Sequence, residues 1–139
     1  MHRYIPLALL ALFGVAFLAS PSDESAGTVR HVVAFKFKED ASPEQISQVV
    51  EAFRALKNKI DVIVSFETGT NVSPEGLNKG FTHCFILTFR NEKDRDAYLV
   101  HPAHKEFGEL VGPLLADVFV VDFWAVWPIG CCVPPACPS

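Results

Sequence analysis

The sequence has no cluster of lysine and arginine residues after its first few positions, and acidic residues outnumber basic ones by 16 to 12. A protein that binds nucleic acid needs a basic face to neutralise the phosphates, so this composition argues against a nucleic-acid partner. The chain also lacks a glycine-rich phosphate loop, a nucleophile elbow and a dinucleotide-binding fingerprint. Nothing in the sequence therefore predicts an organic cofactor.

Cysteine is scarce and unevenly placed. Cys84 lies in a strand-like run, whereas Cys131, Cys132 and Cys137 lie together in the final stretch CCVPPACPS. This spacing is not that of a zinc finger, and Cys84 lies on the opposite strand face from His83, which argues against a catalytic thiol. In an oxidising compartment, a disulfide from Cys137 to Cys131 or Cys132 is the simplest arrangement.

The longest apolar run, residues 5–18, follows a short basic start and precedes the small and polar residues ASPSDESAG. This order is typical of an export signal. The run is shorter than the roughly 20 residues that span a bilayer, so we prefer a removed signal peptide to a permanent anchor. Cleavage after Ala19 or Ala26 would release a periplasmic or extracellular protein without stable membrane insertion.

The rest of the chain divides into one domain, residues 29–126, and a tail rich in Cys and Pro, residues 127–139. Half of all residues are hydrophobic and twelve are Phe, which is enough for a real core. Alternation predicts strands at 29–38, 62–68, 82–89 and 118–126, with Val62, Val64 and Phe66 on one face of the second. Capping signals at Ser42, Asn91 and Pro102 predict helices from 43, from 92 to 100 and from 102 to about 115.

The order β-α-β-β-α-β predicts an α+β, ferredoxin-like domain whose four-stranded antiparallel sheet carries helices on one face. The other face is partly apolar, at Val32, Ala34 and Ile86. A contiguous exposed apolar patch usually marks an interface, so we expect a homodimer that packs sheet against sheet.

The stretch YLVHPAHKEFGELV, residues 98–111, places two histidines beside a proline. Pro102 disfavours helix in the residue before it, which makes His101 a helix cap and puts His104 in the first turn. Helical spacing places His104 on an inward stripe with apolar residues, namely Phe107, Val111 and Leu114. Burial and the positive end of the helix both lower the pKa of such an imidazole and favour its neutral form.

Tyr98 precedes His104 by six residues, and the turn between them brings its hydroxyl toward the imidazole. Three interpretations stay open: a structural histidine that caps a helix, an acid–base pair, or half of a metal site. A metal site would recruit His31 and His83. However, the strands that carry them are expected to be antiparallel neighbours, and each histidine opens its strand, so both are better explained as separate core residues.

Four segments together closely resemble the stress-responsive dimeric α/β-barrel (Dabb) family: HVVAFKFKED, GTNVSPEGLNKGFTH, DAYLVHPAHKEF and VFVVDF. The resemblance covers residues 30–124. It implies a ferredoxin-like fold and a homodimer whose two sheets close into a barrel with the helices outside. Most members have no assigned chemistry, plant members are linked to stress responses, and some members are polyketide cyclases.

The resemblance also implies roles for single residues. The cyclases perform an aldol condensation without metal or cofactor through a Tyr–His pair, which corresponds to Tyr98 and His104 here. The pocket histidines of the cyclases correspond to His31 and His83. Phe53 stands where the cyclases carry a pocket tyrosine, so this chain lacks that hydroxyl.

The main hypothesis is therefore an exported dimer that binds a small apolar molecule between sheet and helices, without turnover. The first alternative is a cofactor-independent lyase in which His104 removes a proton next to a ketone and Tyr98 stabilises the oxygen. The second is a member of the related cofactor-free monooxygenase barrels. The predicted pocket residues are His31, Val33, Phe35, Val49, Phe53, His83, Phe85 and Phe107. Phe53 and Phe107 either fill the space beside His104 or leave a cavity of roughly 300 Å³ or more, the size a ligand needs.

Overall fold

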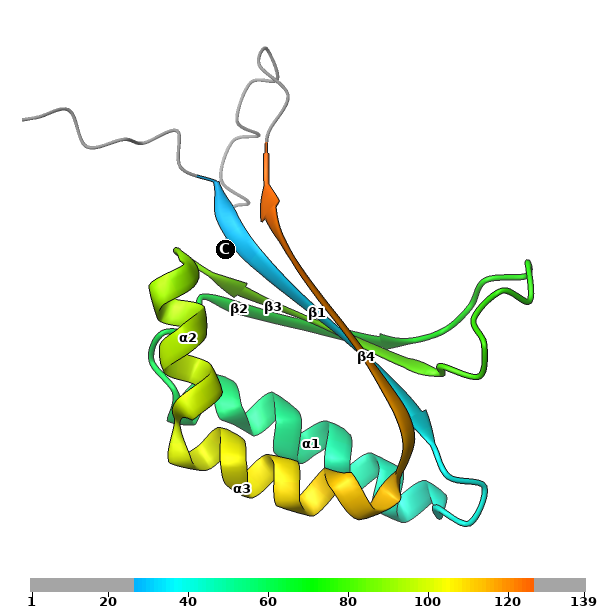
Figure 1. Cartoon of the computed structure of the whole chain (residues 1–139). Helices are drawn as coiled ribbons and strands as arrows, with labels where there is room; N and C mark the ends of the chain where they lie inside the picture. The colour runs from blue at the N-terminus through cyan, green and yellow to red at the C-terminus, as the bar shows by residue number, and fades with distance from the viewer. Residues whose placement is uncertain (1–26, 127–139) are drawn as a thin grey trace, which may run out of the picture.

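The computed structural model describes residues 27–126. Its elements follow the predicted order (Figure 1): β1 (Thr28–Phe37), α1 (Pro43–Lys59), β2 (Ser65–Thr70), β3 (His83–Phe89), α2 (Glu92–Val100), α3 (Pro102–Val111), a 3-10 turn η1 (Gly112–Leu114) and β4 (Leu115–Ala125). The predicted signal peptide and the predicted disulfide of the tail lie outside the described residues. Within residues 27–126, the helices are too short or too polar to cross a membrane.

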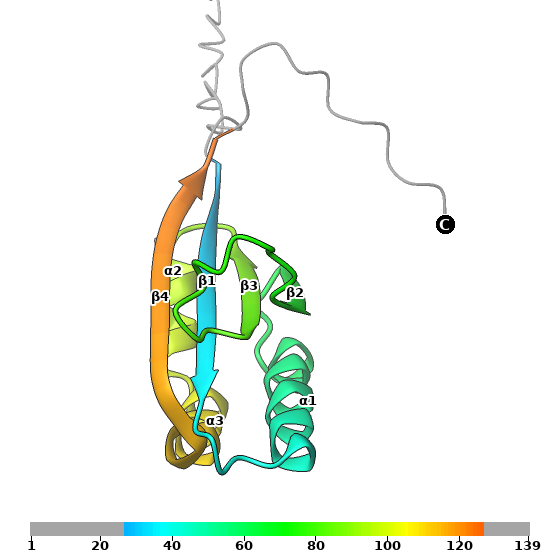
Figure 2. The same ribbon diagram turned by 90° about the vertical axis from the view of Figure 1, so that its right-hand side faces the viewer.

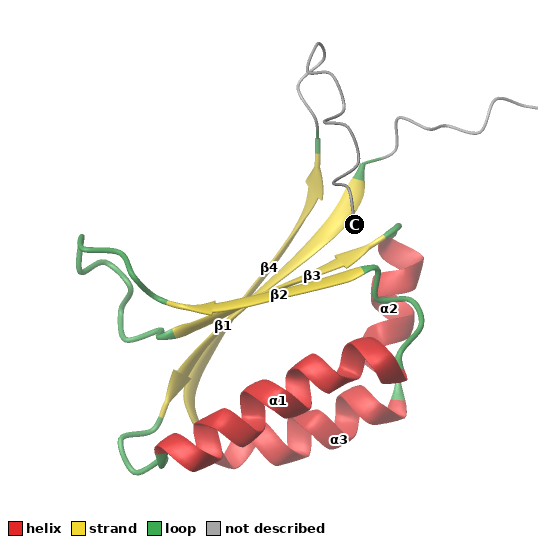
Figure 3. Ribbon diagram, turned by 180° about the vertical axis from the view of Figure 1, so that it is seen from behind, coloured by secondary structure: helices red, strands yellow, loops and turns green. Residues whose placement is uncertain are grey.

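The four strands form one antiparallel sheet in the order β2-β3-β1-β4, which confirms the predicted ferredoxin-like arrangement. The view along the sheet in Figure 2 shows this order, and the view from behind in Figure 3 shows all three helices on the same face. The pairing of β1 with β4 places Asp122 directly opposite His31 and Val120 opposite Val33. Strand β4 is therefore an edge strand, beside the central strand β1.

The start of α1 shows how local sequence sets an element. The Ser42 hydroxyl accepts a hydrogen bond from the backbone N–H of Gln45 at 3.2 Å, and the Gln45 side chain accepts one from the Ser42 backbone N–H at 2.8 Å. Pro43 occupies the first helical position, where its missing N–H costs nothing. This capping box is the one that the sequence predicts. It fixes the register that turns Val49, Phe53 and Leu56 into the core.

The second strand differs from its prediction. β2 begins at Ser65, three residues later than expected, and Ile63 is buried (1% exposed) while Val64 is half exposed (48%). The chain turns after α1, and the Ile63 N–H bonds back to the Ile60 carbonyl at 3.1 Å. The alternation of a strand therefore does not yet apply at residues 62–64. The predicted common face of Val62, Val64 and Phe66 was wrong for this reason.

The sheet has one covered and one open face. The covered face and the helices hold the core, which includes Val33, Phe35, Phe85 and Leu87. The open face carries the predicted apolar residues of β1 and β3. Exposed residues of β4 extend this apolar face: Phe119, Val121 and Phe123.

A candidate ligand-binding cavity between the sheet and the helices

A cavity of about 310 Å³ lies between the β1–β4 edge of the sheet and helices α2 and α3. Phe53 and Phe107 form part of its wall and do not fill it. One end is polar, with His31, Tyr98 and His104, and the remainder is mainly apolar. Val118 and Val120 of β4 line it and are about half exposed, so the cavity opens toward solvent along the edge strand.

Most of the predicted site residues line this cavity. These are His31, Val33, Phe35, Phe53, Tyr98, His104 and Phe107. Val49 and Phe85 are completely buried in the core and do not reach its surface. His83 lies opposite Phe35 in the sheet, nearly a strand's length from His31, and lines two separate hollows beside β2.

His104 is positioned by the joint between α2 and α3. The Nδ1 atom of His101 accepts a hydrogen bond from the Ala103 backbone N–H at 3.1 Å, which makes His101 the N-cap of α3, as predicted. His104 then lies in the first turn, and its Nδ1 lies 3.1 Å from the Leu99 carbonyl oxygen. A carbonyl can only accept, so this contact requires the proton on Nδ1. The Nε2 atom of the neutral ring is then the free, basic nitrogen.

Burial lowers the pKa of His104, and nearby His31 and His101 act in the same direction, against the opposing effect of the Leu99 carbonyl. The imidazole is therefore neutral over a wider pH range than an exposed one.

Tyr98 is completely buried, with its ring centroid 4.3 Å from that of His104 and 5.7 Å from that of His31. The hydroxyl does not hydrogen-bond to His104. Among the described residues, it is the one buried side-chain polar atom without a hydrogen-bond partner. Burial raises the pKa of Tyr98 far above its usual value, so the phenol keeps its proton and is a donor at physiological pH.

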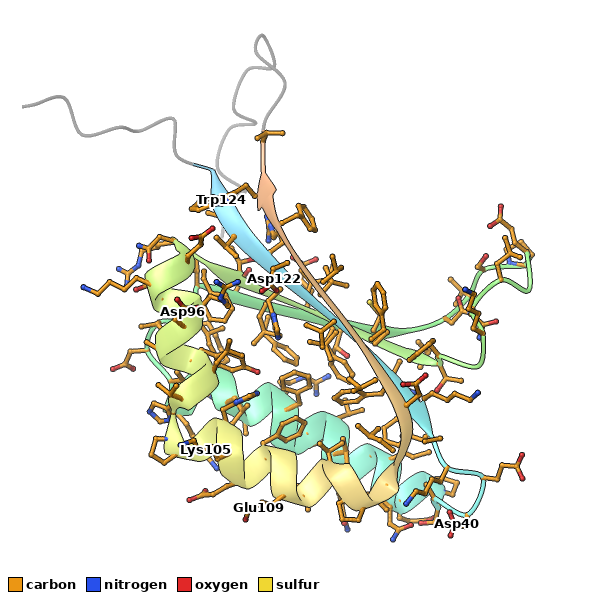
Figure 4. All side chains as sticks on the ribbon, in the orientation of Figure 1. Asp40, Asp96, Lys105, Glu109, Asp122 and Trp124 are labelled. Carbon is orange, nitrogen blue, oxygen red and sulfur yellow. The ribbon has the colours of Figure 1, made fainter. Side chains whose placement is uncertain are left out.

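Sequence reasoning missed an ionic network behind His31. The Nδ1 atom of His31 lies 2.6 Å from Asp122 Oδ1, and Arg95 Nη1 of α2 donates to Asp122 Oδ2 at 2.5 Å. Figure 4 shows Asp122 on the helix-facing side of β4, whereas Lys105 and Glu109 point away from the sheet on the outer side of α3. Burial raises the pKa of the Asp122 carboxyl, but the hydrogen bonds from His31 and Arg95 outweigh it and hold that pKa below its usual value.

The network gives His31 a defined orientation, because the Asp122 carboxylate accepts a hydrogen bond from the Nδ1–H of the imidazole. One signal for Asp122 exists in the sequence, since it is the single charge in the apolar run VFVVDFW. For Arg95, one of several charges on a polar helix, we find no such signal. Across residues 27–126, no three His, Cys, Asp or Glu side chains are grouped to hold a metal ion.

The chain matches the family model of the Stress Responsive A/B Barrel Domain, Dabb, over residues 29–125. It is 37% identical over 101 residues to the stress-response A/B barrel domain-containing protein HS1 of Arabidopsis thaliana, and the aligned region covers 73% of this chain and 93% of that protein. It is 25% identical over 95 residues to olivetolic acid cyclase of Cannabis sativa, and the aligned region covers 68% of this chain and 94% of the cyclase.

Two solved structures extend these similarities. The hydroxynitrile lyase of Passiflora edulis superimposes with a TM-score of 0.69 at 26% identity, covering 74% of this chain and 99% of the lyase. A dimeric protein of ferredoxin-like fold from Bacteroides fragilis has a TM-score of 0.59 at 29% identity, covering 71% of this chain and 97% of that one. The fold, the extent of the match and the level of identity agree: this chain belongs to the stress-responsive A/B barrel (Dabb) family.

Proposed function

We propose that the protein binds a small, largely apolar molecule that carries one carbonyl or hydroxyl oxygen, in the cavity between the sheet and the helices. The observation that carries this proposal is that Tyr98 lines the polar end of the cavity and that its hydroxyl is buried without a hydrogen-bond partner among the described residues. Burying a hydroxyl without a hydrogen bond costs roughly 1–3 kcal/mol. A ligand oxygen that accepts from Tyr98 removes this cost, while the apolar walls take up the rest of the molecule.

A second candidate function is acid–base catalysis on that ligand, and the protonation of His104 favours it. With the proton on Nδ1 directed to the Leu99 carbonyl, Nε2 is free to remove a proton from the carbon next to a ketone. The electron pair of the broken C–H bond moves to the ketone oxygen, which accepts a hydrogen bond from Tyr98. One relative is named a cyclase and one similar structure a lyase, which supports turnover here.

Hydrogen–deuterium exchange into a methyl ketone separates binding from catalysis. Binding of a methyl ketone with a heptyl chain is measured by NMR titration of the protein in D₂O, and exchange at its α-carbon is followed by mass spectrometry. We expect binding, and loss of exchange in His104→Gln, while Lys105→Gln on the outer side of the same helix is unaffected. Because the pKa of His104 is lowered, exchange should reach its plateau below neutral pH.

Each outcome decides one point. Absence of binding refutes the proposed function. Binding without exchange in the wild-type protein refutes catalysis on this class of ketone, and equal exchange in His104→Gln refutes the role of that residue.

We further propose that the protein is a homodimer that packs through its open sheet face. On that face, Phe119, Val121 and Phe123 of β4 are about half exposed and continue the apolar surface of β1 and β3. Leaving this surface in water is unfavourable, and a second copy covers it with the same residues. The dimeric Bacteroides fragilis protein of the same fold supports this assembly.

A further inference from the structure

The loop between β2 and β3, residues 71–82, lies over one end of the open sheet face. Figure 1 shows it projecting beyond the sheet on the side away from the helices, and Figure 2 shows it crossing in front of β1. Two contacts join it to that face. The ring of Phe81 lies edge-on to the ring of Phe119, with centroids 6.3 Å apart, and the Lys36 side chain packs against the backbone of Gly80. The loop and the open face are therefore parts of one continuous surface.

Internal hydrogen bonds give the loop a defined shape. At its base, the Asn71 N–H donates to the Thr82 carbonyl at 2.8 Å. In its second half, the Phe81 N–H donates to the Asn78 carbonyl at 2.8 Å, and the Asn78 side-chain amide donates to the Phe81 carbonyl at 3.0 Å. Lys79 between them adopts a φ of 51°, in the left-handed region that residues other than glycine rarely occupy. The loop therefore presents its outer side chains in defined positions.

Two apolar side chains of the loop are left in water. Val72 is 89% exposed and Leu77 is 74% exposed, more than any large hydrophobic residue within β4. The loop does not close down on its own sheet, because a hollow of about 300 Å³ lies between them, lined by Asn78 on the loop side and by Ala34 and Cys84 on the sheet side. A loop that only covered its own sheet would fill this hollow. Its apolar surface is therefore available to a partner.

The charges of this surface fit a second copy of the chain better than a strongly charged partner. The open face of the four strands carries two basic side chains, Arg30 and Lys36. It also carries two acidic ones, Glu67 and Asp117, so these charges sum to zero. Arg30 Nη1 lies 3.7 Å from Glu67 Oε1, and Lys36 is opposite Asp117 in the pairing of β1 with β4. The loop adds one residue of each sign. In a symmetric dimer the same patch meets itself, and a neutral patch avoids the repulsion of like charges.

We propose that the loop of residues 71–82 is a dimerisation arm, which packs Val72 and Leu77 against a second copy of this chain. The contact of Phe81 with Phe119 makes the arm continuous with the apolar surface of β4, so a copy that covers β4 also contacts the arm. Burial of Val72 and Leu77 in the dimer removes from water the apolar surface that a single chain leaves exposed. This inference rests on the homodimer proposed above and adds to it a contact outside the sheet.

Sedimentation velocity over a dilution series measures the dissociation constant of the dimer. In Val72→Ser and in Leu77→Ser, we expect this constant to rise roughly tenfold or more, because each apolar side chain is lost twice in a symmetric dimer. Val100→Ser and Leu110→Ser are the matched controls. Both replace exposed apolar residues, but on α2 and α3, which lie on the other face of the sheet. The controls should keep the dissociation constant of the wild type, and circular dichroism shows that all four variants are folded.

Hydrogen–deuterium exchange of the loop amides is a second measurement that does not require the dimer to dissociate. The amides of residues 72–77 should exchange more slowly in the wild-type dimer than in Val121→Lys, which places a charge in the open face. Equal exchange in these two proteins, unchanged dissociation constants in both loop variants, or equal losses in the loop variants and the controls would each overturn the arm and leave the sheet-face dimer intact. A monomeric wild type, or a Val121→Lys protein that is still dimeric, would instead refute the sheet-face dimer and the arm together.

Discussion

Replacing Tyr98 by phenylalanine should make the free protein more stable. The ring is fully buried, and its contacts with His31, Phe89 and His104 are kept in the variant, so the change removes only the hydroxyl. A buried hydroxyl without a hydrogen bond costs roughly 1–3 kcal/mol, which is the expected gain in the free energy of unfolding. In a domain of this size, each kcal/mol raises the midpoint of thermal unfolding by roughly 4–8 °C.

Urea and thermal unfolding of the ligand-free protein measure this change. Thr88→Val is the matched control, because Thr88 is also buried but its hydroxyl accepts from Ser65 at 2.8 Å and from Arg30. This control should lose about 1 kcal/mol, opposite in sign to Tyr98→Phe. The same Tyr98→Phe variant should bind the heptyl ketone more weakly, so stability and function change in opposite directions. A Tyr98→Phe protein that is less stable than the wild type would show that the hydroxyl has a partner in the free protein and would refute the reasoning.

Two further predictions concern the open sheet face and the network behind His31. Val121→Lys places a charge in the apolar open face and should convert the dimer to a monomer, whereas Glu109→Lys on the outer side of α3 should leave the dimer intact. Light scattering measures the molar mass of each protein, and a monomeric wild type would contradict the proposed dimer. Arg95→Leu removes one of the two donors that lower the pKa of Asp122, so that pKa should rise. A lowered carboxyl pKa contributes stability above about pH 3.8 that is lost as the pH falls through the folded value. The variant should therefore be less stable than the wild type near pH 6, and the difference between their unfolding midpoints should shrink as the pH falls to about pH 2. A difference that does not change with pH would show that Arg95 does not act on Asp122.

The parts of the fold that depend on local signals were predictable from the sequence. The capping box at Ser42 and the histidine cap before Pro102 are set by residues within three or four positions, and both are present as expected. The pattern of apolar residues also predicted the order of the elements along the chain, and that order predicted the ferredoxin-like sheet. By contrast, β2 begins late because residues 62–64, whose apolar character resembles that of a strand, belong to the connection after α1. Composition alone does not separate the two.

The candidate site was predictable only in part. His104 could be placed on the inward stripe, since helical spacing fixes its direction. The bond between His31 and Asp122 joins residues 91 positions apart and depends on the exact register of β1 with β4. The absence of a hydrogen bond between Tyr98 and His104 depends on ring orientations, which no spacing rule gives. Such contacts come from tertiary packing, which a single sequence does not specify.

The joint at His101 has a consequence for how the cavity can change. This one residue is both the C-cap of α2 and the N-cap of α3, so no loop separates the helices that carry Tyr98 and His104. The separation of the two rings thus depends on the backbone conformation of His101, and Pro102 fixes the direction of the second helix. Substitutions of cavity residues on β4 or further along α3 do not alter this connection between the two helices. Substitutions in the apolar walls can consequently change the size and shape of the cavity while the arrangement of Tyr98 and His104 stays constant.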